Sequence, residues 1–154
     1  MKTFNNSIYK LSKNFLLHEF KVSNDHPELA ENIKFTIEDV LKLKILCLEC
    51  LQPIREKFGV LFILSGKRNK KLNDAVGGSK TSDHLNSMAA DFVSLNHDME
   101  HIFKWIVLES GIDFRQIIYY PEQNFIHISC NVPGRKTKKQ ALIKKGKQYL
   151  DFKH

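Results

Sequence analysis

The segment SGKRNKKLNDAVGGSKTSDHLNSMAADF, which runs from Ser65 to Phe92, decides how the rest of the chain can be arranged. Its first part is polar and contains glycines, so it predicts a long loop, and loops of this length in small proteins usually have a function. Near its end, Ser82, His84 and Asp91 stand in the pattern Ser-x-His-(x4)-Ala-x-Asp. The segment therefore predicts a functional loop that leads into a strand carrying Asp91.

Helical and strand patterns lie on both sides of this loop. Apolar residues recur at helical spacing over 36–58, where Thr36 and Asp39 resemble a capping box and Pro53 should bend the helix or end it early. The other expected elements are strands over 60–65 and 89–94, a short helix over 69–75, a helix over 97–109 capped by Asn96, and two strands, Phe114–Tyr120 and Phe125–Cys130, that pair as a hairpin. This order predicts an α+β fold with N-terminal helices packed on a small, mostly antiparallel sheet.

The composition is typical of one ordinary soluble domain. Of the 154 residues, 42% are hydrophobic and 27% are charged, and neither a repeat nor a low-complexity linker divides residues 1–154. No apolar run approaches the ~20 residues that cross a bilayer, and the first residues lack the features of a signal peptide. We therefore expect a monomeric, single-domain protein that is made in the cytoplasm and has no transmembrane segment.

Basic residues are concentrated near the C-terminus. The net charge is +7, and residues 135–154 are rich in lysine and arginine with one acidic residue, Asp151. Such a segment suits an anionic partner, which could be nucleic acid, a membrane surface or an anionic wall polymer, and it also fits a solvated face without a partner. A nucleic-acid-binding domain ranks last, because the chain has no recognition helix or RNA-binding signature.

A second histidine completes a possible metal site. His127 lies in the strand-like sequence NFIHIS, so His84, Asp91 and His127 together offer two imidazoles and one carboxylate. Such a set binds zinc and leaves a fourth coordination position open to water, whose pKa zinc lowers. Taken singly, each of these residues also fits a hydrogen-bonded structural role.

Several segments of the chain resemble one known family; they are LSKNFLLHEF, QPIREKFG, SGKR, LNDAVGGSKTSDH, FIHIS and NVPGRKTKKQAL. Through them the chain resembles the zinc D-Ala-D-Ala carboxypeptidase family of peptidoglycan peptidases, especially its small, endolysin-like phage and prophage members. The resemblance implies that His84, Asp91 and His127 bind one zinc ion, which we expect at the sheet edge. It also implies that Arg68 binds the substrate's carbonyl or terminal carboxylate, a role that suits its planar fork of donors. Ser82 either orients the site through a hydrogen bond or caps a turn.

The expected hairpin adds a tyrosine to the site. If residues 121–124 form a four-residue turn, Tyr120 lies opposite Phe125 and Ile118 lies opposite His127. All four side chains then share one face of the sheet. Tyr120 would therefore point toward the metal, where its hydroxyl could bind and polarise the substrate.

The chain departs from the family pattern at three positions. Ser87 stands where glycine is usual. Asn124 stands three residues before His127, where a catalytic acid is expected, and Tyr120 replaces a glutamate that often ends the preceding strand. The nearest acid is Glu122, which is our hypothetical general base, and an exposed turn glutamate is the alternative.

By this resemblance, the chain is expected to be a zinc metallopeptidase. Its substrate would be a D-Ala-containing bond of the peptidoglycan stem peptide or cross-link, and its action that of a carboxypeptidase or an endopeptidase. A role in phage or prophage cell-wall lysis, with holin-type release, fits the expected lack of a signal peptide, and residues 135–154 could hold the enzyme on an anionic wall polymer. The alternative is a non-catalytic, zinc-containing module that binds cell-wall peptide.

Overall fold

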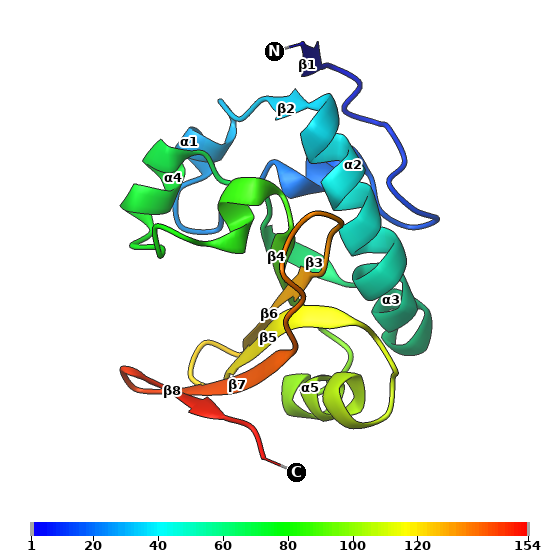
Figure 1. The fold of residues 1–154 in the computed structure, drawn as a ribbon, viewed down its shortest axis with the longest axis vertical. Coiled ribbons are helices and arrows are strands. Elements are labelled where there is room, and N and C mark those ends of the chain that lie inside the picture. Colours follow the sequence, from blue (N-terminus) through cyan, green and yellow to red (C-terminus); the bar gives the residue numbers. More distant parts are fainter. Residues whose placement is uncertain (1, 154) are drawn as a thin grey trace.

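A six-stranded sheet carries the site within residues 2–153, which are the residues that the computed structural model describes (Figure 1). The spatial order is β3 (Phe62–Ser65), β4 (Ala89–Val93), β6 (Phe125–Cys130), β5 (Phe114–Tyr120), β7 (Gln140–Lys145) and β8 (Gln148–Asp151). All neighbouring strands are antiparallel except β5 and β7, which are parallel. A separate antiparallel pair is formed by β1 (Thr3–Phe4) and β2 (Phe35–Thr36). The predicted α+β class and mostly antiparallel sheet are confirmed.

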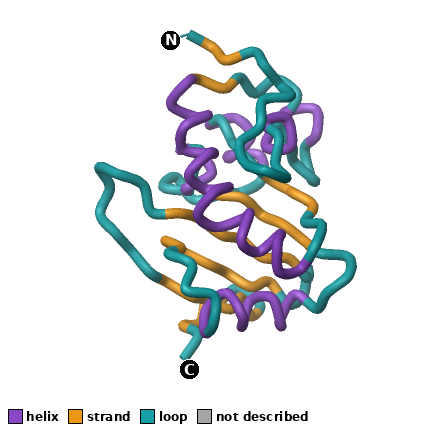
Figure 2. Tube along the Cα trace, turned by 90° about the vertical axis from the view of Figure 1, so that its right-hand side faces the viewer, coloured by secondary structure: helices purple, strands orange, loops and turns teal. Residues whose placement is uncertain are grey.

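One long helix dominates the helical part of the molecule. It consists of α2 (Ile37–Leu46), the π-helical segment η2 (Cys47–Leu51) and α3 (Gln52–Phe58), and Figure 2 shows it crossing in front of the strands. The shorter helical elements are η1 (Leu17–Phe20), α1 (Pro27–Ala30), α4 (Lys70–Ala75), η3 (Asp83–Asn86) and α5 (Met99–Leu108). Within residues 2–153, none of these helices is both long and apolar enough to cross a membrane.

The long helix begins and continues for identifiable reasons. The predicted capping box is present: the amide of Asp39 donates to Thr36 Oγ1 at 3.1 Å, and the amide of Thr36 donates to Asp39 Oδ2 at 2.7 Å. Pro53 lies just after the π-helical turn and does not end the helix. Proline has no amide proton and crowds the carbonyl four residues earlier, and a wider turn makes room for it.

The sheet has one face in the core and one face toward a cavity. On β4, Ala90 and Phe92 are buried in the hydrophobic core, whereas Asp91 lines the cavity. On β6, Ile126 and Ile128 belong to the same core. Because side chains alternate along a strand, every residue between these core positions faces the cavity. This alternation places His127 on the same face as Asp91.

Two predicted features of the C-terminal half differ from the structure. The helix predicted over 97–109 begins at Met99, and its N-cap is Asp98 instead of Asn96, because the Asp98 carboxylate accepts the amide of His101 at 2.9 Å. Part of residues 135–154, the basic segment for which the sequence predicted no helix or strand, forms β7 and β8. Lysines surround the short apolar run of β7, so the run did not indicate a strand.

Candidate metal centre

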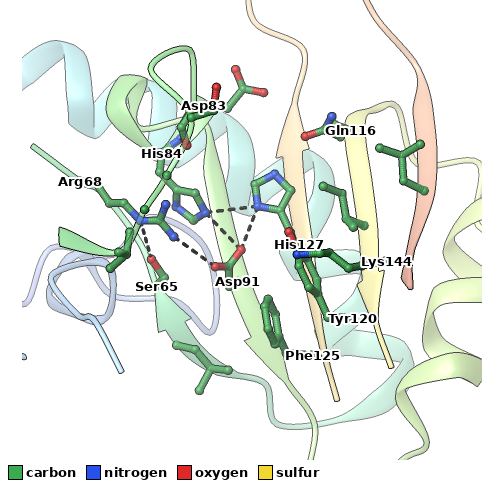
Figure 3. Close-up of a pocket in the computed structure, with 18 of the residues that line it drawn as sticks. Ser65, Arg68, Asp83, His84, Asp91, Gln116, Tyr120, Phe125, His127 and Lys144 are labelled. Carbon is green, nitrogen blue, oxygen red and sulfur yellow. Dashed lines mark hydrogen bonds and ion pairs between the residues drawn. The ribbon is translucent and has the colours of Figure 1, made fainter. Parts of the chain in front are cut away.

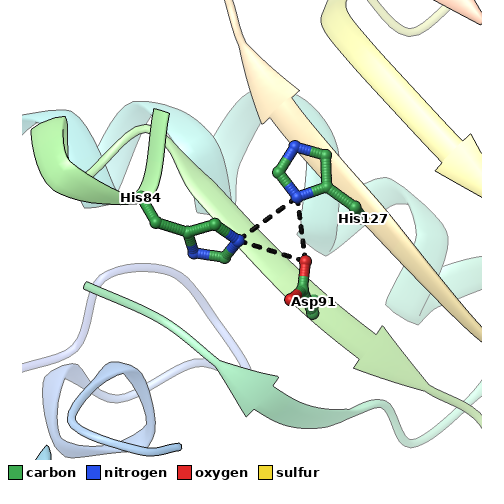
Figure 4. A group of neighbouring side chains, drawn as sticks. All are labelled: His84, Asp91 and His127. Atoms are coloured by element: carbon green, nitrogen blue, oxygen red, sulfur yellow. Dashed lines mark hydrogen bonds and ion pairs between the residues drawn. The ribbon is translucent and has the colours of Figure 1, made fainter. Parts of the chain in front are cut away.

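Three elements bring His84, Asp91 and His127 together. The pairing of β4 with β6 places Asp91 directly opposite His127, and η3 brings His84 over the same place (Figure 4). Asp91 Oδ1 lies 3.1 Å from His84 Nε2 and 2.8 Å from His127 Nδ1, and the two nitrogens are 3.2 Å apart. All three residues are buried. The residues that the sequence singled out as ligands therefore form one compact group.

The donor atoms of this group fit a bound metal ion. Three atoms bonded at 2.0–2.1 Å to a tetrahedral zinc ion would be separated by about 3.3 Å, close to the spacing seen here. His84 Nδ1 lies 2.7 Å from the carbonyl oxygen of Gly66, which directs Nε2 toward the other two donors. Hydrogen bonds of this kind commonly fix the orientation of metal-binding histidines. The group could thus hold a metal ion.

The protonation states also suit a metal. Burial alone would raise the pKa of Asp91, but His84 and His127 outweigh it and hold this pKa well below the usual range. Burial lowers the pKa of His84, although Asp91 opposes this shift. An ionised carboxylate beside a neutral imidazole is the state that metal binding requires.

The centre lies on the face of the sheet, which corrects its predicted place at the sheet edge. Asp91 and His127 lie on β4 and β6, which are the second and third strands in the order of the sheet. Both strands have neighbours on either side, so neither is an edge strand. The cavity opens over this face, opposite the core.

Arg68 lies against the metal group. Its Nη2 is 3.5 Å from Asp91 Oδ2, so the two oxygens of Asp91 serve different partners (Figure 3). Its Nε donates to Ser65 Oγ at 3.2 Å and its Nη1 to Asn73 Oδ1 at 3.4 Å. A side chain at Gly78 would overlap Asn73, so glycine is needed there. Burial lowers the pKa of Arg68, an effect that Asp91 opposes.

The turn that carries His84 is tied to the long helix through Ser87. Ser87 adopts the left-handed conformation, with φ of 57°, which explains why glycine is usual at this position. Its hydroxyl donates to Asp39 Oδ1 at 2.7 Å, and the other carboxylate oxygen of Asp39 binds Lys67 and Thr36. These bonds anchor the turn that contains His84.

Ser82 caps this turn: its hydroxyl accepts the amide of His84 at 3.3 Å. Of the two roles that the sequence left open, the observed bond is the capping one. Ser82 also lines the cavity.

The predicted register of the hairpin is confirmed. Tyr120 pairs with Phe125, and Ile118 pairs with His127. All four side chains line the cavity, and the rings of Tyr120 and Phe125 are stacked with centroids 4.3 Å apart (Figure 3). Burial raises the pKa of Tyr120 well above its usual value. Tyr120 therefore presents a protonated hydroxyl in this cavity.

The structure does not bring Glu122 to the metal group, which argues against our hypothesis of a general base there. Glu122 is exposed, does not line the cavity, and accepts the amide of Gly146 at 3.2 Å. Asn124 has φ of 55°, a conformation that asparagine tolerates better than most residues. The turn therefore explains the asparagine at the position where an acid was expected, and it directs Glu122 toward β7 and β8.

The cavity has a volume of about 840 Å³ and is lined by residues that the sequence did not single out. Asp83 lies next to His84 in the sequence, which could have drawn attention to it. Asp25, Lys138 and Lys144 are distant from the motif in sequence. The two lysines belong to the basic segment 135–154, but no pattern indicated that they or Asp25 line the cavity.

Comparison with known proteins agrees with this geometry. A family model described as peptidase M15 matches residues 14–129, which is more than half of the chain. This match includes the three metal-group residues and Arg68, and it ends before β7. No curated protein matches the chain. Peptidases of this family are zinc-dependent metallopeptidases. The chain belongs to the peptidase M15 family, the zinc D-Ala-D-Ala carboxypeptidase family that its motifs resemble.

Proposed function

We propose that this protein is a zinc-dependent peptidase that hydrolyses a D-alanine-containing peptide bond of peptidoglycan. The observation that carries this proposal is the convergence of three donor atoms, 2.8–3.2 Å apart, at the positions that match the family's ligands. The surrounding cavity is large enough for a peptide segment, because ligand cavities commonly measure ~300–1,000 Å³.

The side chains around the metal group have distinct tasks in this proposal. A zinc ion held by His84, Asp91 and His127 would polarise the scissile carbonyl and lower the pKa of water. Arg68 would bind the substrate's carbonyl or terminal carboxylate, because its guanidinium lies beside Asp91 and lines the cavity. Tyr120 would donate its hydroxyl proton in a hydrogen bond to the same ligand.

In this proposal the proton acceptor is a carboxylate that lines the cavity, which Glu122 does not. The carboxylates that line the cavity are Asp25, Asp83 and Asp91. Asp91 belongs to the metal group, and Asp83 lies 3.3 Å from Arg115 and 3.5 Å from Arg135. Asp25 is exposed and near enough to raise the pKa of Arg68. Asp25 is therefore our candidate for the group that accepts a proton from water.

A second function is a zinc-containing module that binds wall peptide without cleaving it. One observation favours this function: the acid nearest in sequence to His127 is turned away from the cavity and hydrogen-bonded to Gly146. Among residues 2–153, Asp25 is then the cavity carboxylate that belongs neither to the metal group nor to the pairs of Asp83 with Arg115 and Arg135. The two functions differ in turnover and not in metal content.

Mass spectrometry of peptidoglycan fragments incubated with the zinc-loaded protein separates the two functions. Loss of a terminal D-alanine, or cleavage of a cross-link, is expected to depend on zinc and to stop with a chelator. The Asp25→Asn variant should keep its zinc and lose at least about 10²-fold in rate. Intact fragments with a fully zinc-loaded protein would favour the binding module.

We also place this activity in phage or prophage cell-wall lysis, after holin-type release, on the basis of the resemblance to small phage members. Lys145 and Lys147 are exposed and could meet an anionic wall polymer. Lysis of cells that co-express a holin, compared with cells that express the protein alone, tests this role.

A further inference from the structure

The wall of the cavity that lies beyond the metal group is cationic. It is formed by β5, residues 131–139 and β7, and we call it the strand wall. Its charged residues that line the cavity are Arg115, Arg135, Lys138 and Lys144. The two arginines share Asp83, with nitrogen–oxygen distances of 3.3 and 3.5 Å. The lysines are not part of that cluster.

Both lysines point into the cavity because of the strand period. Lys138, Gln140, Leu142 and Lys144 are separated by two residues each, and all four line the cavity. Lys139 has the other parity, and its ammonium lies 5.0 Å from the centre of the ring of Phe114, a residue of the hydrophobic core. The alternation along residues 138–144 thus separates lysines that line the cavity from lysines that face elsewhere.

Neither cavity lysine has an acidic partner within residues 2–153. Lys144 Nζ lies 4.9 Å from the centre of the Tyr149 ring and 5.8 Å from that of Tyr120, and Figure 3 draws Lys144 next to Tyr120. Aromatic faces attract an ammonium without neutralising its charge. Lys138 is exposed. Two positive charges therefore face the cavity with no carboxylate to balance them.

We propose that Lys144, beside Tyr120, binds a carboxylate of the substrate, separate from the group that Arg68 binds. Lys138 lies about 20 Å farther along the wall, because six extended residues separate the two lysines. Gln116 and Gln140 lie on the same wall, joined by a hydrogen bond of 2.7 Å, and supply neutral donors and acceptors between the two lysines. The ligand would be a peptide with an acidic residue in addition to the group at the metal. This inference rests on the proposed function, because stem peptides contain acidic residues whose carboxyl group is free or amidated.

Two synthetic stem peptides that differ only in this carboxyl group, one free and one amidated, test the subsite. Binding to the zinc-loaded protein is measured by calorimetry, and kcat/KM is compared wherever the peptides are cleaved. The wild type should prefer the free acid by roughly 2- to 5-fold, the range expected for one partly exposed ion pair, and this preference should weaken with salt. The Lys144→Gln variant should bind both peptides equally.

The matched control is Lys145→Gln, which removes the same charge from an exposed lysine that does not line the cavity. It should keep the preference for the free acid. Absence of any preference in the wild type, or a preference that survives in the Lys144→Gln variant, overturns the subsite even if hydrolysis is observed. Carboxylate-dependent binding without hydrolysis instead contradicts the proposed peptidase and leaves the subsite standing.

Discussion

Two walls of one cavity are built on different principles. The loop wall, residues 65–91, holds its polar side chains through bonds to one another: Arg68 binds Ser65, Asn73 and Asp91, and His84 binds Gly66. The strand wall presents Lys138 and Lys144, which have no acidic partner in the part of the chain that the structure describes. Side chains whose hydrogen bonds are made within the protein are fixed in position for catalysis, whereas charged side chains without a partner in the protein can bind a charged group of the substrate.

The family match covers the loop wall and part of the strand wall. Residues 14–129 include the whole loop wall and β5, whereas residues 131–139 and β7 lie outside the match. This contrast leads to four tests, in order of decreasing expected effect.

The largest effect is expected from His84→Ala, which removes a ligand of the proposed metal site. The protein should lose its bound zinc and at least about 10³-fold of its turnover, because the ion contributes several kcal/mol to the reaction. Zinc content by elemental mass spectrometry and peptide hydrolysis measure the two losses. His101→Ala is the control, because His101 is exposed on α5 and outside the cavity. Full zinc content in His84→Ala would remove His84 from the metal site.

Asp39→Asn should break the support beneath the loop wall. Asp39 pairs with Lys67 and accepts the Ser87 hydroxyl, and loss of one member of such a buried pair costs about 3–5 kcal/mol. Burial alone would raise the pKa of Asp39, but bonds from Lys67, Thr36 and Ser87 lower it overall. The carboxylate therefore stabilises the fold fully above the unfolded pKa of about 3.9, and this contribution is lost as the pH falls through the lower folded pKa.

Urea unfolding of both proteins at pH 6 and near pH 3 measures this difference. The gap in unfolding free energy between wild type and Asp39→Asn should narrow at the lower pH. A gap that stays constant would show that the charge of Asp39 contributes nothing to stability.

A smaller effect is expected at Ser87, where two contributions oppose each other. The left-handed conformation costs a non-glycine residue about 1 kcal/mol, and the bond to Asp39 contributes about 1.5–3 kcal/mol. Ser87→Ala loses the bond and keeps the strain, whereas Ser87→Gly loses the bond and relieves the strain. Both should lower the unfolding free energy, and alanine should lower it about 1 kcal/mol more than glycine. A glycine variant more stable than the wild type would mean that strain outweighs the hydrogen bond.

Glu122→Gln should have the smallest effect. Glutamine keeps an oxygen that can accept the amide of Gly146, so stability should change by less than about 0.5 kcal/mol. Turnover should stay within about two-fold of wild type, whereas a general base would cost at least about 10²-fold. Such a large loss would restore Glu122 to the mechanism and require the turn to move on substrate binding.

The sequence predicted the elements that local chemistry determines. The turn between β5 and β6 and the alternation of their residues gave the bounds and register of the hairpin, and Thr36 with Asp39 gave the start of the long helix. The spacing of His84 and Asp91, taken with the family resemblance, gave the metal group. Each of these depends on residues a few positions apart or on a motif that the family shares.

The remaining features depend on contacts that no local pattern contains. Glu122 is close to His127 in sequence, but the turn directs it to Gly146, so sequence distance was a poor guide. The lysine-rich residues 136–147 look like a solvated segment until residues 140–145 pair with β5 as β7. Asp25 reaches the cavity only because the neighbouring Ser23 bridges to Ser65 on β3.

The parallel pairing of β7 with β5 has a consequence for solubility. Without β7, β5 would be an edge strand with an open row of amides and carbonyls beside apolar residues such as Ile117 and Tyr119. Edges of that kind recruit strands of other molecules and promote aggregation. β7 covers this edge, and the new edge is β8, which is only four residues long, is exposed and ends in Asp151. The segment that gives the cavity its positive wall thus also protects the sheet from self-association.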